Sequence, residues 1–260
     1  MRVPVTIITM LIVLSGAAQD SSLYRYSRFI SNGDTLNYRL MYPDRYDVNK
    51  KYPVVLFLHG VGERGNDNEA QLKWGGTLFS DSTNRTKFPA FVIFPQCAND
   101  DYWANMSIDK AKKDSLGVYV YHSSRPFNPS LGLVSKLIDS FARTPQVDSS
   151  RFYLGGLSMG GMGTFELLWR KPKFFAAAIA ICGGGDPGQV KRYANKFPIW
   201  IFHGGADFLV PASGSRLMVK TLKAAGAKVT YTEYPGVGHD SWKNAFREPT
   251  LLDWLFAQKK

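Results

Sequence analysis

Hydrophobic residues along the chain gather into short unbroken runs separated by polar or amphipathic stretches. Such runs are typical of strands that are buried on both faces of a sheet, and they occur at Val54 to Leu58, Phe91 to Phe94, Phe152 to Leu154, Ala176 to Ile181, Ile199 to Phe202 and Val229 to Thr232. Apolar residues at helical spacing lie between them and predict helices over Leu131 to Arg143, Gly160 to Arg170, Gly188 to Asn195, Ser213 to Ala225 and Asn244 to Gln258. Strands that alternate with helices predict an α/β fold, with a mostly parallel central sheet and helices on both faces.

The N-terminal part of the fold has a different pattern. Tyr24 to Ile30 and Leu36 to Tyr42 carry alternating apolar residues around the turn Ser31-Asn32-Gly33-Asp34, which predicts an antiparallel hairpin. The length suits a single domain over residues 19–260. Asp100 to Ser130 is long for a loop in a compact domain, and we interpret it as an insertion over the active-site face; a plain surface loop is the alternative.

Residues 1–18 have the pattern of a secretory signal peptide. Met1-Arg2 supplies a positive head, Val3 to Leu14 is apolar, and small residues follow, so we expect cleavage after Ala18. The apolar run is shorter than the roughly 20 residues of a membrane span. We therefore expect a secreted or periplasmic protein with no stable membrane insertion after cleavage; an uncleaved N-terminal anchor is the alternative.

The formal net charge is +11, which raises the question of a nucleic-acid partner. The basic residues are scattered in twos and threes, without interleaved aromatic residues or a nucleic-acid motif. This arrangement favours solvated surfaces, and we expect no nucleic-acid partner.

The first candidate for chemistry is Ser158, in Leu154-Gly155-Gly156-Leu157-Ser158-Met159-Gly160-Gly161. One serine between glycines, after a strand and before a helix, is typical of a nucleophile elbow, where the chain turns so sharply that side chains two positions either side would collide. Gly156 and Gly160 remove that collision. The N–H of Met159, at the start of the helix, is a candidate donor to an oxyanion.

A serine nucleophile needs a base, and the base needs a carboxylate to orient it. Among the four histidines, His239 lies on a glycine-rich loop after the last strand run, and Asp207 follows the buried run Ile199 to Phe202. The order Ser158, Asp207, His239 is that of the hydrolase triad. Asp186 and Asp240 remain as alternatives to Asp207.

The loop after Val54 to Leu58 reads His59-Gly60-Val61-Gly62-Glu63-Arg64-Gly65. Its glycines allow the backbone to approach a substrate carbonyl, and the N–H of Val61 is the second candidate oxyanion donor. Glu63 and Arg64 either fix this loop or touch substrate, and we favour the first. His59 and His203 we expect to be structural.

These motifs, together with Phe94-Pro95-Gln96-Cys97, His203 to Pro211 and Gly238 to Trp242, resemble the α/β-hydrolase superfamily. More narrowly, residues 52–260 are similar to secreted bacterial esterases of the phospholipase/carboxylesterase and feruloyl or acetylxylan esterase kinds. The resemblance implies a serine esterase with Ser158, Asp207 and His239 as triad and Val61 and Met159 as oxyanion donors. The segment 100–130 is longer than the resemblance leads one to expect.

The chemistry expected is hydrolysis of a small-molecule or polysaccharide ester, acetyl or feruloyl, through an acyl-enzyme, which needs no metal or cofactor. Aromatic residues that could line a substrate groove are Trp74, Tyr102, Trp103 and Trp242, although each could equally be core. A peptidase of prolyl-oligopeptidase type and a non-catalytic binding protein of the same fold are the alternatives.

Two cysteines in an exported chain suggest a disulfide. In the strand order that the resemblance implies, however, two strands separate Cys97 from Cys182, and three spacings of about 4.8 Å exceed the reach of a disulfide. We expect both thiols to be free.

Overall fold

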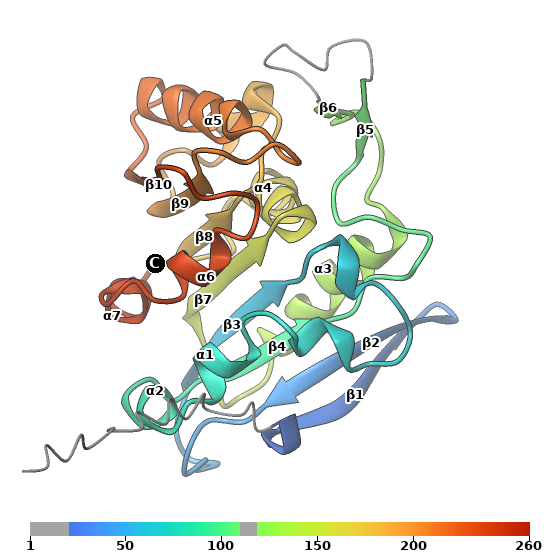
Figure 1. The fold of residues 1–260 in the computed structure, drawn as a ribbon. Coiled ribbons are helices and arrows are strands. Elements are labelled where there is room, and N and C mark those ends of the chain that lie inside the picture. The colour runs from blue at the N-terminus through green and yellow to red at the C-terminus, as the bar shows by residue number, and fades with distance from the viewer. Residues whose placement is uncertain (1–20, 110–118) are drawn as a thin grey trace, which may run out of the picture.

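An eight-stranded mixed sheet runs through the middle of the protein, which is described by a computed structural model over residues 21–109 and 119–260 (Figure 1). Counted across the sheet from its N-terminal edge, the first strand pairs antiparallel with the second and the second pairs antiparallel with the third. All the remaining neighbours in the sheet are parallel. In spatial order the strands are β1 (Tyr24–Ser31), β2 (Asp34–Met41), β4 (Phe91–Pro95), β3 (Tyr52–Leu58), β7 (Val147–Leu157), β8 (Ala177–Ile181), β9 (Ile199–Gly204) and β10 (Val229–Tyr234). This confirms the α/β fold and the N-terminal antiparallel hairpin.

Helices cover both faces of the sheet because side chains of the central strands alternate between two cores. In β3, Val54, Leu56 and Leu58 belong to one hydrophobic cluster, and Val55 and Phe57 belong to the other. The first cluster contains side chains from α3 (Pro129–Phe141), α4 (Met159–Arg170), η5 (Pro187–Arg192) and α5 (Ala212–Ala224). The second contains side chains from η3 (Ala70–Leu72), α1 (Gly76–Ser80), α6 (Trp242–Ala245) and α7 (Leu251–Phe256).

Three features of the helices differ from expectation. The expected helix from Asn244 to Gln258 is two short helices, α6 and α7, with Pro249 between them. Proline cannot donate a helical hydrogen bond and restricts the residue before it, so one continuous helix is excluded there. The expected helix from Gly188 is the 3₁₀-helix η5. Two short helices are not expected from the sequence, namely α1 and α2 (Ser82–Lys87), of which α2 is capped at its N-terminus by Asp81.

The segment from Asp100 to Ser130 forms a small two-stranded antiparallel sheet of β5 (Met106–Ile108) and β6 (Tyr119–Tyr121). Its residues Met106, Tyr119 and Tyr121 pack against a cluster that includes Met162 of α4. Residues 110–118 of this segment and the expected signal peptide lie outside the described residues. No helix within the described ranges has both the length and the hydropathy to cross a membrane.

Cys97 and Cys182 follow β4 and β8, and β3 and β7 lie between those strands in the sheet. Both cysteines are buried and free, as the sequence predicts.

Candidate active site

Ser158 occupies the junction of β7 and α4, near the centre of the sheet. Its backbone has φ 52° and ψ −117°, a left-handed conformation that a non-glycine residue adopts at a cost of about 1–3 kcal/mol. The N–H of Ser158 donates to the carbonyl oxygen of Ile181 in β8 at 2.9 Å, which ties the turn to the next strand. The hydroxyl is therefore held on a strained and well-fixed turn.

The glycines on either side of Ser158 are required by close backbone contacts. A Cβ on Gly156 would lie 2.2 Å from the carbonyl oxygen of Gly160, and a Cβ on Gly160 would lie 2.0 Å from the carbonyl oxygen of Leu58 in β3. Real Cβ atoms do not approach backbone oxygen so closely. The collision expected from the sequence is thus present at Gly156, and Gly160 is required by a second close contact, with the backbone of β3.

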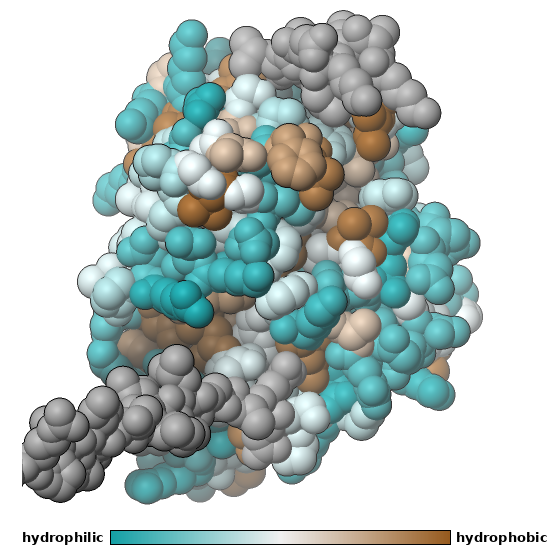
Figure 2. Space-filling model, viewed as in Figure 1, coloured by the Kyte–Doolittle hydropathy of each residue, from teal (hydrophilic) through white to brown (hydrophobic). Residues whose placement is uncertain are grey.

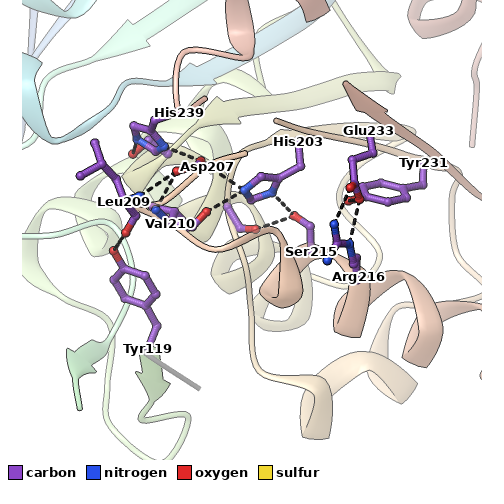
Figure 3. A network of polar contacts seen from close by, with 12 residues as sticks. Tyr119, His203, Asp207, Leu209, Val210, Ser215, Arg216, Tyr231, Glu233 and His239 are labelled. Atoms are coloured by element: carbon purple, nitrogen blue, oxygen red, sulfur yellow. Dashed lines mark hydrogen bonds and ion pairs between the residues drawn. The ribbon is translucent and has the colours of Figure 1, made fainter. Parts of the chain in front are cut away.

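The structure brings Ser158 and His239 together, although 81 residues separate them. The hydroxyl oxygen of Ser158 lies 2.9 Å from Nε2 of His239. On the other side of the ring, Nδ1 of His239 lies 2.7 Å from Oδ2 of Asp207 (Figure 3). Because an ionised carboxylate can only accept, Nδ1 of His239 carries a hydrogen and donates a hydrogen bond to Asp207. The lone pair of Nε2 then faces the serine hydroxyl. This is the arrangement in which an imidazole can remove the serine proton.

Both carboxylate oxygens of Asp207 accept hydrogen bonds. Its Oδ1 accepts the N–H groups of Leu209 and Val210 at 3.0 and 2.9 Å. Burial alone would raise the pKa of this carboxyl, but hydrogen bonds from His203, His239 and the Val210 amide outweigh burial and hold the pKa below its usual range. Asp207 is therefore ionised wherever the protein is folded at ordinary pH.

The two alternative carboxylates have other partners. Asp186 accepts the N–H of Gly188 at 2.8 Å and a hydrogen bond from the hydroxyl of Ser123. Asp240 pairs with Lys243, whose ammonium lies 2.7 Å away and holds the pKa of Asp240 below its usual range. Of the three candidates, Asp207 is the one whose carboxylate is hydrogen-bonded to His239.

The two candidate oxyanion donors stand at the first positions of two helical elements, one short and one long. Val61 begins η2 (Val61–Glu63) and Met159 begins α4, and the first N–H groups of a helix have no acceptor within it. The position of a Cβ on Gly60, directly before Val61, is 3.7 Å from Cβ of Ser158, so this loop passes beside the nucleophile.

Glu63 and Arg64 lie on this loop and have separate partners. Glu63 is only 4% exposed; burial raises the pKa of its carboxyl, against hydrogen bonds from the Gly60 backbone and the Trp74 indole. The guanidinium of Arg64 lies 4.6 Å from the ring centre of Tyr102 and donates to the carbonyl oxygen of Asp101 at 3.2 Å. The contacts support the loop-fixing role that the sequence favours for both residues.

The structure corrects one of the expected groove residues. Trp103 is completely buried, and its indole N–H donates to the carbonyl oxygen of His59 at 3.0 Å, so its side chain belongs to the core. Trp242 packs edge-on against His239 with ring centres 5.4 Å apart, and Trp74 lies 5.6 Å from Trp242. Trp242 is only 9% exposed and belongs to the second hydrophobic cluster, so of these two residues Trp74, which is partly buried, is the one whose ring could reach a substrate.

The described residues contain no group of three or more histidine, cysteine or carboxylate side chains that could hold a metal ion.

A comparison with protein families decides the class. Residues 47–249 match the phospholipase/carboxylesterase family. The chain belongs to this family. It is a serine ester hydrolase with the α/β-hydrolase fold. Family membership favours this activity over both the peptidase and the non-catalytic alternatives.

Individual relatives and structures agree with this class. The chain is 26% identical over 212 residues to acyl-protein thioesterase 1 of Neurospora crassa, covering 75% of this chain and 82% of that protein. It is 24% identical over 215 residues to a probable feruloyl esterase C of Aspergillus oryzae, covering 81% of this chain and 70% of that protein. The crystal structure of a thermostable esterase is similar with a TM-score of 0.80 and 34% identity, over 92% of this chain and 64% of that chain.

Proposed function

We propose that this family member is an exported carboxylic-ester hydrolase that uses Ser158 as nucleophile, His239 as general base and acid, and Asp207 to orient His239. The observation that carries the proposal is the continuous hydrogen-bonded line from Ser158 through His239 to Asp207, with distances of 2.9 and 2.7 Å. Serine, base and carboxylate are within the reach that proton transfer requires.

In the first step the oxygen of Ser158 attacks the ester carbonyl carbon while its proton passes to Nε2 of His239. The carbonyl oxygen becomes an oxyanion, which the N–H groups of Val61 and Met159 stabilise. The imidazolium then donates its proton to the departing alkoxide, the alcohol leaves, and an acyl-enzyme on Ser158 remains.

In the second step a water molecule takes the place of the alcohol. His239 accepts a proton from the water as its oxygen attacks the acyl carbon, and the same proton then returns to the oxygen of Ser158. The carboxylic acid is released and the enzyme is restored. Asp207 stays ionised throughout and stabilises the imidazolium of each step.

The substrate we favour is an ester attached to a polysaccharide, with an acetyl or feruloyl acyl group. Trp74 supports this choice because its partly buried ring packs against Trp242, which in turn packs against His239, and could stack on a sugar or an aromatic group. Phe208 and Leu209, next to Asp207, are 84% and 56% exposed and would contact the same substrate. Figure 2 shows such exposed hydrophobic side chains as separate patches in a mainly hydrophilic surface, several of them in the part of the view where β5, β6 and α5 lie.

Covalent labelling tests the nucleophile. A fluorophosphonate should attach to the native protein and not to Ser158→Ala, which should also lose several orders of magnitude of ester hydrolysis while keeping its melting temperature. Ser82→Ala, at an exposed serine of α2, is the matched control and should label normally. Near-normal hydrolysis by Ser158→Ala would contradict the proposal.

A substrate panel tests the class of ester. Short acyl esters, acetylated xylan, feruloylated xylan and peptide amides would be compared by kcat/KM. Higher kcat/KM for the xylan esters than for the short esters supports the polysaccharide assignment, and preferential cleavage of the amides would favour the peptidase alternative.

Export is tested separately. N-terminal sequencing of the secreted protein should give a start after residue 18, and a start at Met1 would contradict export with cleavage.

A further inference from the structure

A second histidine contacts the carboxylate that orients His239. His203 is the next-to-last residue of β9, four positions before Asp207, and its Nε2 lies 3.3 Å from Oδ2 of Asp207. The same oxygen accepts the hydrogen bond from His239 at 2.7 Å, so two imidazoles share one carboxylate oxygen (Figure 3). The side chains of His203 and Asp207 are both completely buried.

The partners of His203 on its Nδ1 side determine where one hydrogen lies. Nδ1 is 2.8 Å from the hydroxyl oxygen of Ser215 in α5, and that hydroxyl is 2.7 Å from the carbonyl oxygen of Gly183. Because a carbonyl oxygen can only accept, the Ser215 hydroxyl donates its single hydrogen to the carbonyl oxygen of Gly183. Ser215 must then accept from His203, which places a hydrogen on Nδ1.

The Nε2 side of His203 faces only acceptors. Nε2 lies 2.8 Å from the carbonyl oxygen of Val210, in addition to its contact with Asp207. Neither group can donate a hydrogen bond, so Nε2 also carries a hydrogen. We propose that His203 is an imidazolium, and that it is a positioning residue which shares the negative charge of Asp207 with His239.

The charges around His203 permit a buried cation. Asp207 faces it from its own loop, and Glu233 of β10 lies opposite His203 in the register of the sheet. Glu233 is itself bound by Arg216 of α5, which contributes most to holding the pKa of Glu233 at about 2, and His203 contributes in the same direction. Two ionised carboxylates therefore accompany the cations His203 and Arg216, as a buried charge requires.

The consequence for catalysis rests on the proposed roles of Asp207 and His239. A positive charge on His203, next to the shared oxygen, weakens the electrostatic attraction between Asp207 and a protonated His239. Replacing His203 by a neutral residue therefore changes the charge that faces His239, and the pH dependence of hydrolysis measures that change. The contact also fixes the orientation of the Asp207 carboxylate between its two ring donors.

His59, at the end of β3, provides an internal comparison. Its Nε2 accepts the N–H of Cys97 at 3.0 Å, so that nitrogen has no hydrogen and the ring is neutral. Burial lowers the pKa of His59 to about 4, which agrees with a neutral ring. The chain thus holds two buried histidines at strand ends that are expected to differ by one proton.

Imidazole nitrogen NMR of the full chain tests the charge without reference to activity. At pH 7 His203 should show two ring N–H signals with both nitrogens at the chemical shifts of imidazolium, whereas His59 should show one. His203→Gln and His59→Gln assign the signals by their loss. A single ring N–H for His203 would overturn the proposal even if the protein proves to be an esterase.

The catalytic consequence is tested by the pH dependence of kcat/KM. In His203→Gln the acidic limb should move to higher pH by roughly one unit. The substitution removes a unit positive charge that is separated from His239 only by the carboxylate of Asp207. Arg216→Gln removes a cation that is bound to Glu233 and not to Asp207, and should leave the limb in place. An unmoved limb in a folded His203→Gln protein would refute the shared-charge role. If instead the proposed triad is wrong, Ser158→Ala would hydrolyse esters at the native rate.

Discussion

The turn at Ser158 predicts a large effect of adding one methyl group at Gly160. In Gly160→Ala the new Cβ would lie 2.0 Å from the carbonyl oxygen of Leu58, 2.5 Å from its carbonyl carbon and 2.7 Å from the carbonyl oxygen of His59. All three atoms are backbone atoms at the end of β3, so no side-chain rotation can relieve the overlap. Either α4 must move away from β3 or the turn at Ser158 must change.

Overpacking a tight interior costs about 1–3 kcal/mol, and an overlap with three backbone atoms belongs at the upper end of that range. About 3 kcal/mol corresponds to a fall in Tm of roughly 6–12 °C for a domain of this size. Because the shift displaces the nucleophile, kcat should fall at least 100-fold, in line with the sensitivity of catalysis to misplacements of about 1 Å. Thermal unfolding by circular dichroism and hydrolysis of a short acyl ester measure the two effects.

Gly62→Ala is the matched control. A Cβ at Gly62 meets nothing within 4 Å, and its backbone does not adopt the left-handed conformation, so the Tm should stay within about 2 °C of the native value. The reasoning would be refuted by a Gly160→Ala protein with native Tm and native kcat.

Three further perturbations have defined outcomes. Asp207→Asn should lower kcat by about 10⁴-fold in a short-ester assay, because the amide cannot hold the required tautomer of His239; a loss of less than tenfold would contradict the assigned role. Burial raises the pKa of both thiols, to about 12 for Cys97, so mass spectrometry should find no alkylation of Cys97 or Cys182 by iodoacetamide at pH 8 in the native fold and two adducts after unfolding; a native adduct would argue against burial. The guanidinium of Arg216 lowers the pKa of Glu233 to about 2, so this pair stabilises the fold above the unfolded pKa of about 4.3 and ceases to do so as pH falls through 2. Glu233→Gln should therefore cost at most about 1 kcal/mol in urea unfolding at pH 7, given the exposure of the pair, and much less near pH 2; an equal cost at both pH values would refute this sign.

The parts of the site that the sequence predicts well are those fixed by local chemistry. The steric reason for Gly156 acts within five residues, because its Cβ would meet the carbonyl oxygen of Gly160, whereas Gly160 is also required by the backbone of β3 at Leu58. The chain order of Ser158, Asp207 and His239 is informative because each follows a strand, and parallel strands end at the same edge of a sheet. The central strands are predicted by their unbroken apolar runs, because both faces of these strands are buried.

Features that depend on which neighbour a side chain meets are not readable in this way. Trp103 and Trp74 look alike in sequence, yet Trp103 is buried with its indole N–H on the His59 carbonyl, and Trp74 remains partly exposed beside Trp242. The difference arises because the chain returns after β4 and lays Trp103 over α4, where a Cβ on Gly163 would be 2.4 Å from the Trp103 Cβ. No local pattern predicts that contact.

The two His-Gly pairs at strand ends make the same point about charge. His59 and His203 each end a buried strand run and precede a glycine, so the sequence gives them the same structural role. One meets an amide donor at Nε2 and must be neutral there, whereas the other meets only acceptors at Nε2 and a committed hydroxyl at Nδ1. The difference is a whole unit of charge, and the charged ring, His203, lies 3.3 Å from the carboxylate that orients His239. The basicity of His239 therefore depends on a residue whose sequence context is indistinguishable from that of a neutral histidine.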